Sequence, residues 1–384
     1  MVVSGDCWLF SGILPAFVRL GPAEDADIYG VSLASFGESR WFDASGQPSA
    51  IGVLNQAPSV VLDRVRRREC LLLLDMSNEG QPFLPEWLEV LHRGLDQLGL
   101  PPGCCAYLQQ NRQYETAYLE WASGRGVRPI HIRVHDHFIA HLSRTFEAKP
   151  LPSGSTPSRH YLSLNFTPRP LRTSLVAWLV ATGLEARGYI SLGGFAHPKM
   201  PYTDPRLLEQ FPYRSLAEEG LRLLRERAPF RLDLETDQAA GVEMSPGPSA
   251  YYDDSIFSLV AETDVSAGDV VRITEKVIKP LAAGHPVLLL GNPGSLALLR
   301  NLGFQTFEGF ADERYDLIKD PTARIKNVLD QVTSLCALTV DELRIRRERI
   351  GPVLEFNAVH AQRLLKEQYQ HNWIPSLFNS FYAE

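Results

Sequence analysis

The sequence predicts an α/β protein made of two Rossmann-like domains that face a cleft. Its 384 residues exceed the common size of one domain and suit two. Strand-like and helix-like patterns alternate on both sides of a Pro/Ser-rich stretch at 149–158, which is typical of a linker. We therefore expect four parts, in chain order: an N-terminal α/β domain over 1–150, a linker over 151–158, a C-terminal α/β domain over 159–350 and a helical segment over 351–384.

In the first half, short buried runs alternate with amphipathic patterns. Strands are expected over 70–75, 105–109 and 129–134, and helices over 84–98 and 114–123. Such alternation is typical of a parallel sheet covered by helices.

The second half repeats this alternation around one irregular insertion. Strands are expected over 160–164, 189–192, 256–261 and 287–290, and helices over 171–182, 274–283 and 295–301. The segment 198–248 is Pro-rich and charged, and we expect it to be irregular. The charged stretch from 320 onward and residues 353–370 have helical patterns.

The overall charge argues against a nucleic-acid-binding surface. The formal net charge is -7, and the basic run at 64–68 suits a solvated helix face.

The five cysteines are odd in number and lack metal-ligand or secreted disulfide spacing, which favours a reducing cytoplasm. No signal peptide is recognised at the start, and the longest apolar runs are strand-sized, so no membrane span is expected. Any contact with a lipid-linked substrate would be peripheral.

The most informative segment runs from Ser258 to Val287. It contains a strand, a polar loop, a helix start with Thr274, Glu275 and Lys276, and a Gly-His-Pro turn into a buried strand. In open α/β sheets, ligands bind beyond the carboxyl ends of strands, where helix N-termini present free amides to anions. Glu275 can accept hydrogen bonds from ribose hydroxyls, and Lys276 supplies a charge for a phosphate. The same residues also suit a simple helix cap without a ligand.

This segment resembles a known enzyme family. Thr274-Glu275-Lys276 followed by Gly284-His285-Pro286-Val287 is similar to the signature of α-1,3-fucosyltransferases and related GT-B glycosyltransferases. Gly291-Asn292-Pro293-Gly294-Ser295 and residues 302–307 resemble uncharacterised bacterial and phage glycosyltransferase-like proteins. The resemblance covers roughly residues 250–320 and implies a ribose contact for Glu275 and a phosphate contact for Lys276. It points to a GDP-type donor, but the sequence departs from the pattern at Lys279-Pro280, so the base and the sugar stay open.

A second group of residues supports the same ligand. Asn165 ends an expected strand, and Arg169 and Arg172 lie at the start of the helix that follows. The related family places an arginine here against the diphosphate, which implies that role for Arg172 and makes Arg169 a possible second contact. Alternatively, either arginine covers a helix surface.

The first half supplies the expected acceptor side. Sugar transfer needs a base that takes the proton of the attacking hydroxyl. Glu79 follows the buried strand at 70–75 and is the first choice, while Asp75 is expected to bond to the backbone of its own turn. Asn111, beyond the strand at 105–109, is a candidate contact for the acceptor.

Four histidines lie close together in the sequence: His131, His135, His137 and His141. His135 and His137 are candidates for proton transfer. Zinc binding by this cluster is the alternative, although no second ligand group accompanies it.

Asp25-Ala26-Asp27 is the one Asp-X-Asp pair in the sequence. No apolar strand precedes it and a loop is expected, so a metal-independent site is favoured.

The sequence therefore predicts a glycosyltransferase that moves a sugar from a nucleotide-sugar donor to a hydroxyl of a glycan-type acceptor. An inverting reaction without cofactor or metal is expected, in a cleft between the two halves. The alternatives are a sugar-nucleotide or glycan-binding protein without a working base, and a metallohydrolase built on the histidine cluster.

Overall fold

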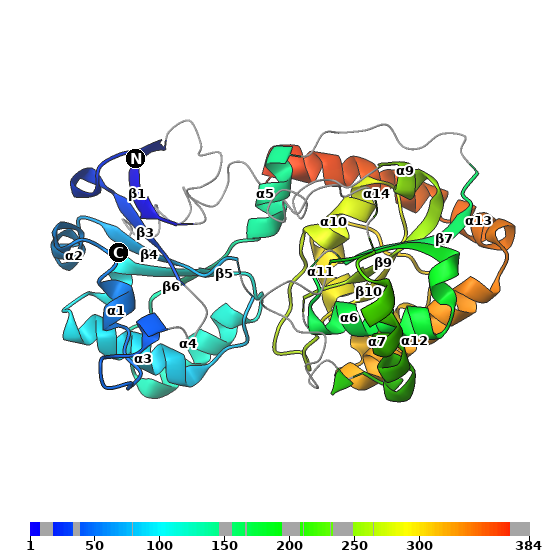
Figure 1. The fold of residues 1–384 in the computed structure, drawn as a ribbon. Coiled ribbons are helices and arrows are strands. Elements are labelled where there is room, and N and C mark those ends of the chain that lie inside the picture. Colours follow the sequence, from blue (N-terminus) through cyan, green and yellow to red (C-terminus); the bar gives the residue numbers. More distant parts are fainter. Residues whose placement is uncertain are drawn as a thin grey trace. The chain divides into compact units, whose positions relative to one another are not determined.

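The computed structural model describes residues 1–7, 18–33, 39–78, 80–145, 156–165, 167–193, 208–209, 211–230, 232, 249–263 and 265–368 (Figure 1). The chain divides into two compact units. Unit 1 comprises residues 1–144 and the described residues 366–368, and unit 2 comprises residues 145–365. Each unit contains one parallel sheet with helices, which confirms the predicted α/β class.

Unit 1 has a six-stranded sheet in the order β2-β1-β3-β4-β5-β6, and every neighbouring pair is parallel. Its strands are β1 (Val2–Asp6), β2 (Arg19–Leu20), β3 (Ile28–Ser32), β4 (Leu71–Asp75), β5 (Cys105–Gln109) and β6 (His131–Val134). Every residue of β4 and β5 is buried, as expected for central parallel strands covered on both faces.

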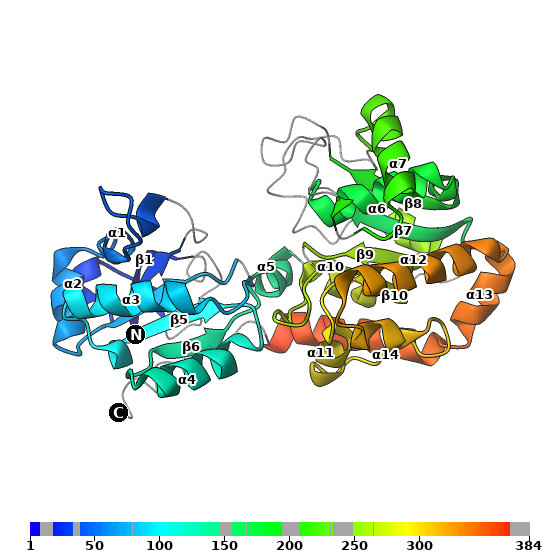
Figure 2. The same ribbon diagram turned by 90° about the horizontal axis from the view of Figure 1, so that it is seen from below.

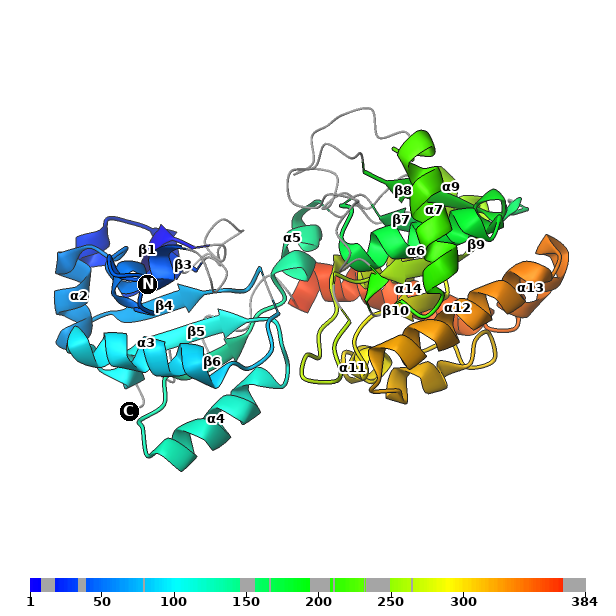
Figure 3. The same ribbon diagram turned by 60° about the horizontal axis from the view of Figure 1, so that its bottom comes forward.

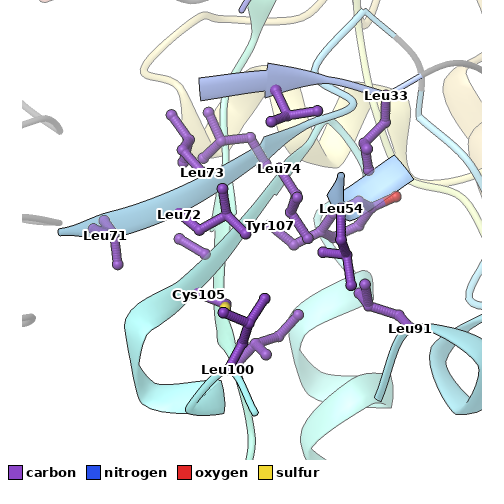
Figure 4. Close-up of a cluster of buried hydrophobic side chains, with 14 of the residues drawn as sticks. Leu33, Leu54, Leu71, Leu72, Leu73, Leu74, Leu91, Leu100, Cys105 and Tyr107 are labelled. Carbon is purple, nitrogen blue, oxygen red and sulfur yellow. The ribbon is translucent and has the colours of Figure 1, made fainter. Parts of the chain in front are cut away.

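The helices of unit 1 are α1 (Ile51–Leu54), α2 (Ser59–Arg66), α3 (Pro85–Gln97), α4 (Tyr114–Arg125) and α5 (His137–Thr145). Short 3₁₀ turns lie at Ala23–Asp25, Ser39–Trp41 and Pro102–Cys104. In Figures 1 and 2, α3 and α4 lie on the same face of the sheet. Figure 4 shows Leu54 of α1, Leu91 of α3 and Tyr107 of β5 in the hydrophobic cluster around β4, so local amphipathic patterns converge on one core.

Unit 2 has a four-stranded sheet in the order β10-β9-β7-β8, again with every neighbouring pair parallel. Its strands are β7 (Arg159–Asn165), β8 (Gly188–Leu192), β9 (Ser255–Ala261) and β10 (Val287–Leu290). The chain passes from β7 to β8 on one side and then returns to β9 and β10 on the other. The strand order therefore reverses between β7 and β9.

The helices of unit 2 are α6 (Pro170–Ala181), α7 (Arg214–Arg227), α9 (Ser249–Asp253), α10 (Glu275–Ala282), α11 (Ser295–Asn301), α12 (Pro321–Ala337), α13 (Val340–Glu348) and α14 (Gly351–Arg363). Further turns lie at Leu184–Arg187 and Glu313–Leu317, and a π-helical turn spans Leu364–Gln368. Figure 1 shows α10 and α14 on one side of this sheet, with α6, α7 and α12 on the other. Figure 3 shows α7 beside α6.

Two sequence expectations need correction. The segment 198–248 contains the fourteen-residue helix α7, whose many charged residues hid its amphipathic pattern within a Pro-rich context. Asp25-Ala26-Asp27 does follow strands, because β1 and β2 precede it, but β1 has only two leading valines and lacks a strong strand pattern. Asp27 Oδ2 accepts a hydrogen bond from the Val2 amide at 2.7 Å, so this carboxylate ties β1 to the turn before β3.

No helix within the described ranges is long and apolar enough to cross a membrane.

Candidate functional site

The topology of unit 2 identifies where a ligand is expected. In open parallel sheets, the crevice for ligands lies at the carboxyl ends of the strands between which the order reverses. In unit 2 these strands are β7 and β9. Asn165 is the last residue of β7, and Glu262 directly follows β9. Both side chains are buried, so the polar groups at this edge are held in place by the fold.

Arg172 connects the two strand ends. It lies in the first turn of α6, and its side chain is 3% exposed. Its Nε donates to the Ala261 carbonyl at 3.2 Å, and its Nη2 donates to Thr263 Oγ1 at 3.3 Å. Its Nη1 donates to the Thr167 carbonyl at 3.2 Å. These three acceptors are neutral oxygen atoms, and they hold the guanidinium at the reversal point.

Arg169 is the residue immediately before α6. Its backbone amide donates to the Thr167 carbonyl at 2.8 Å, and no side chain caps the helix. Its guanidinium makes no hydrogen bond or ion pair with any described residue. Arg169 therefore stays a candidate second cation at the same helix start.

Thr274 and Glu262 fix the start of α10. Thr274 is the N-cap, and its Oγ1 accepts from the Lys276 amide at 3.4 Å. Its hydroxyl donates to Glu262 Oε2 at 2.9 Å, and its amide donates to Glu262 Oε1 at 3.0 Å. The expected helix cap is therefore present, and hydrogen bonds to the Glu262 carboxylate hold it beside the end of β9. Glu262 was not among the predicted site residues, although it directly follows an expected strand.

Glu275 is the central residue of the candidate site. Its side chain is 2% exposed, and its Oε1 accepts from Lys276 Nζ at 2.6 Å. Its Oε2 is buried and has no hydrogen-bond partner anywhere in the described part of the chain. Such an atom is uncommon in folded proteins, because a buried polar group without a partner loses the hydrogen bonds it makes with water.

The surrounding charges keep Glu275 ionised. Burial alone raises the pKa of its carboxyl, but the charges of Lys276, Lys279 and Arg172, with the Lys276 hydrogen bond, hold that pKa below its usual range. The carboxylate is therefore an acceptor at neutral pH, and Oε2 requires a donor. The same electrostatic effect shows that Arg172 and Glu275, which are 103 residues apart in the sequence, act on each other in the fold.

Two asparagines present further polar atoms without partners. Asn165 Nδ2 donates to Ser163 Oγ at 2.8 Å, and its buried Oδ1 is left without a donor. Asn292, two residues beyond β10, accepts from the Ser266 amide at 2.6 Å through Oδ1, and its buried Nδ2 is left without an acceptor. Because these partners orient both amides, the edge offers one acceptor from Asn165 and one donor from Asn292. Asn292 was quoted in the family resemblance but not predicted as a site residue.

The neighbouring helix α11 has no such capacity at its start. Asp316 accepts from the Leu296 amide at 3.0 Å and the Ala297 amide at 3.2 Å. Its own carboxylate thus occupies the place where an external anion would bind. Burial raises the pKa of this carboxyl, against the hydrogen bonds that it accepts.

His285, in the Gly-His-Pro turn, has a structural position. It is fully buried; Nε2 lies 2.6 Å from the Tyr252 carbonyl, and Nδ1 lies 3.1 Å from Ser258 Oγ. A carbonyl can only accept, so Nε2 carries the proton and Nδ1 accepts from the serine hydroxyl. This part of the motif fastens β10 to β9 and α9.

In unit 1, Glu79 lies outside the described residues, so the structure gives no position for the predicted base. Asp75 ends β4, and its Oδ1 accepts from the Ser77 amide at 2.8 Å, as expected for a carboxylate that bonds to its own turn. Its Oδ2 accepts from Cys7 Sγ at 2.9 Å. Asn111 is fully buried, and its Nδ2 donates to the Gln81 carbonyl at 3.0 Å while its Oδ1 accepts from the Gln113 amide at 3.1 Å.

The histidines do not form one cluster. His131, at the start of β6, has Nε2 3.0 Å from the Gly103 carbonyl, at the opposite end of the strand from His135 and His137. His135 and His137 are buried, with ring centroids 6.3 Å apart in an edge-to-face arrangement. The side chain of His141 lies outside the described part. Among the described residues, no group of three or more His, Cys, Asp or Glu side chains is arranged to hold a metal ion.

Comparison of the chain with protein-family models, with curated proteins and with solved structures gives no match.

Proposed function

We propose that unit 2 binds a nucleoside-diphosphate sugar and that the chain is a glycosyltransferase of the GT-B type. The observation that carries this proposal is the buried, ionised Glu275, whose Oε2 has no partner in the described chain and which lies within the electrostatic influence of Arg172 and Lys276. This combination occurs where the strand order of a parallel sheet reverses.

The polar groups at this edge match the parts of such a donor. A diphosphate carries negative charge and suits the cations Arg172 and Lys276. A ribose has vicinal hydroxyls and suits an acceptor such as Glu275. The acceptor Asn165 Oδ1 and the donor Asn292 Nδ2 add two neutral contacts for the base or the sugar. A purely anionic ligand would use the cations but leave the acceptor oxygens without donors.

Binding would exchange the partners of Lys276. Its ammonium group bonds to Glu275, and its side chain is 19% exposed. A diphosphate would attract the ammonium group and uncover the carboxylate, which then accepts from ribose hydroxyls. The ion pair therefore keeps both groups ordered before the donor arrives, and this reduces the ordering that binding requires.

In the proposed reaction, the acceptor hydroxyl attacks the anomeric carbon as the bond from that carbon to the diphosphate oxygen breaks. A base takes the hydroxyl proton, and the departing negative charge is stabilised by Arg172 and Lys276. Glu79 remains the proposed base, with His135 or His137 as alternatives and Asn111 as a proposed acceptor contact. A GDP-type donor, a glycan-type acceptor, inversion and independence from metal are parts of the same proposal.

Calorimetry with GDP, UDP, CDP, dTDP and inorganic pyrophosphate tests the donor site. Lys276→Ala should weaken binding of the preferred nucleotide by about 1.5–3 kcal/mol, the scale of a charge-assisted contact. Glu275→Gln should weaken nucleotides but leave pyrophosphate binding nearly unchanged. Lys326→Ala, which removes an exposed cation from α12 in the same unit, is the matched control and should have no effect. Unchanged nucleotide affinity in Lys276→Ala would contradict the assignment.

Turnover separates an enzyme from a binding protein. Hydrolysis or transfer of the preferred donor by the wild type, with strong loss in Glu79→Gln, is expected if the chain is catalytic. Nucleotide binding without turnover on any tested acceptor would favour the non-catalytic alternative.

A further inference from the structure

A second polar site lies in unit 1, on the loop that follows β4. The Met76 amide donates to the Leu108 carbonyl at 2.9 Å, which holds the loop beside β5. Gln110 Nε2 donates to the Ser77 carbonyl at 2.6 Å, and Asn111 Nδ2 donates to the Gln81 carbonyl at 3.0 Å. The loop is therefore fastened at three points to the carboxyl end of the neighbouring strand, the edge at which α/β sheets bind ligands.

Three side chains of this loop carry buried oxygen atoms without partners. They are Ser77 Oγ, Asn78 Oδ1 and Gln81 Oε1, and none has a hydrogen-bond partner within the residues that the structure covers. Ser77 is fully buried, whereas Asn78 and Gln81 are half-buried. Nearly all buried polar atoms in folded proteins are paired, so three unpaired atoms within five residues indicate a group that is to be completed by a ligand.

The fastening bonds do not use these atoms. The loop is held through the backbone carbonyls of Ser77 and Gln81, and Asp75 holds the Ser77 amide. The side chains at positions 77 and 81 are therefore not needed for the hydrogen bonds that order the loop. Their polar atoms are available to recognise another molecule.

The chemistry of the loop favours a neutral ligand. The nearby Arg112 forms an ion pair with Asp136, and Asp75 accepts from Cys7 and Ser77. The unpaired atoms are one hydroxyl oxygen and two amide oxygens. The amide oxygens accept hydrogen bonds, and the serine hydroxyl can donate or accept, so alcohol hydroxyls of a ligand can pair with all three. An anionic ligand would lie against these oxygen atoms, which repel negative charge.

We propose that Ser77, Asn78 and Gln81 bind a neutral polyhydroxylated ligand, such as a sugar ring. In the proposed complex, hydroxyl groups of the ligand pair with the three oxygen atoms Ser77 Oγ, Asn78 Oδ1 and Gln81 Oε1. This site stands on unit 1 alone and does not rest on the donor site proposed for unit 2.

Saturation-transfer NMR on the full chain tests this site, with D-glucose, D-galactose and N-acetylglucosamine as probes and inorganic phosphate as the anionic comparison. At least one sugar should bind at millimolar concentration, with Ser77→Ala and Gln81→Ala each weakening it about tenfold, the loss of one well-placed hydrogen bond. Ser123→Ala, on the exposed face of α4, is the matched control. Lys276→Ala should leave sugar binding unchanged, which separates this site from unit 2.

The thermal midpoint separates ligand recognition from structural support. Removing an unpaired buried hydroxyl leaves no partner behind, so Ser77→Ala should keep or raise the midpoint while sugar binding falls. Binding of none of the three sugars, or sugar binding that Ser77→Ala and Gln81→Ala leave unchanged, would overturn the proposal. A lower thermal midpoint in Ser77→Ala would show that the hydroxyl stabilises the fold, and this result would also overturn the proposal. Loss of nucleotide binding in Lys276→Ala would support the donor site of unit 2 and would leave the sugar site of unit 1 unaffected.

Discussion

At the residue scale, the motif from Thr274 to Val287 contains the buried polar side chains of Glu275 and His285, of which only one has hydrogen-bond partners for all its polar atoms. Glu275 has an oxygen that no described residue satisfies, whereas both ring nitrogens of His285 have partners. Full burial favours the neutral ring of this histidine over the charged one. Burial and the charge of Arg347 lower the pKa of His285 to about 3, against the bond to the Tyr252 carbonyl. Within this motif, position in the sequence did not reveal which residue supports the fold.

The first prediction follows from that pKa. The folded pKa of His285 lies below its ordinary value of 6.5, so the unfolded chain binds more protons between these values. The stabilising contribution is complete above about pH 6.5 and is lost as the pH falls towards 3. His285→Gln should lower stability at pH 7 yet reduce the slope of stability against pH between 6 and 4 by up to about 1.4 kcal/mol per unit.

Urea unfolding at a series of pH values measures this slope. A His285→Gln chain that loses stability on acidification as steeply as the wild type would show that other groups cause the acid sensitivity.

At the scale of elements, the packing of α6 determines where Arg172 lies. The helix is buried along most of its length, because it packs between the sheet and α7. The contact with α7 is close: a Cβ added to Gly220 would lie 1.8 Å from the Ala177 carbonyl oxygen. Glycine is therefore required at this crossing for steric reasons, although it is a poor helix former.

The second prediction compares two glycines in helices. Gly220→Ala must push α7 away from the backbone of α6, so we expect a loss of about 1–3 kcal/mol in the free energy of unfolding, despite the better helix propensity of alanine. Gly124→Ala is the control, because a Cβ on this α4 residue would meet nothing within 4 Å. That variant should gain roughly 0.5–1 kcal/mol.

Chemical denaturation of both variants checks this pair. Equal stability changes in the two would mean that the α6–α7 crossing tolerates a methyl group.

At the scale of the whole molecule, each unit has the features of a domain that can unfold by itself. Unit 1 contains its own hydrophobic cluster, whose members all lie between Val3 and Ile132. Unit 2 has buried strands and helices of its own, from Tyr161 to Leu365. Separate cores favour separate cooperative transitions, and the proposed nucleotide contacts all belong to unit 2.

The third prediction concerns calorimetric unfolding of the full chain. We expect two transitions, and the preferred nucleoside diphosphate at about one hundred times its Kd should raise only that of unit 2, by roughly 5–10 °C. Gly220→Ala identifies that transition by lowering it. A single transition that shifts as one with nucleotide would contradict independent unfolding of the units.

The sequence by itself determined most of the regular elements. The predicted limits of β5, β10 and α11 agree with the structure, because buried apolar runs and turn residues are local signals. The elements that were not predicted include the first three strands and α7. In β1 the pattern is short and polar, and in α7 it is rich in charge. These elements gain their stability mainly from contacts with distant parts of the chain.

For the candidate sites, the sequence identified the chemical types, and the tertiary structure decided their partners. Thr274, Glu275 and Lys276 could be recognised as a helix start suited to an anion. Only the fold showed that Glu262 holds Thr274 and that Arg172 influences Glu275. The physical reason is that strand and helix periodicities are local properties, whereas an unpaired buried atom is defined by every group that surrounds it in space.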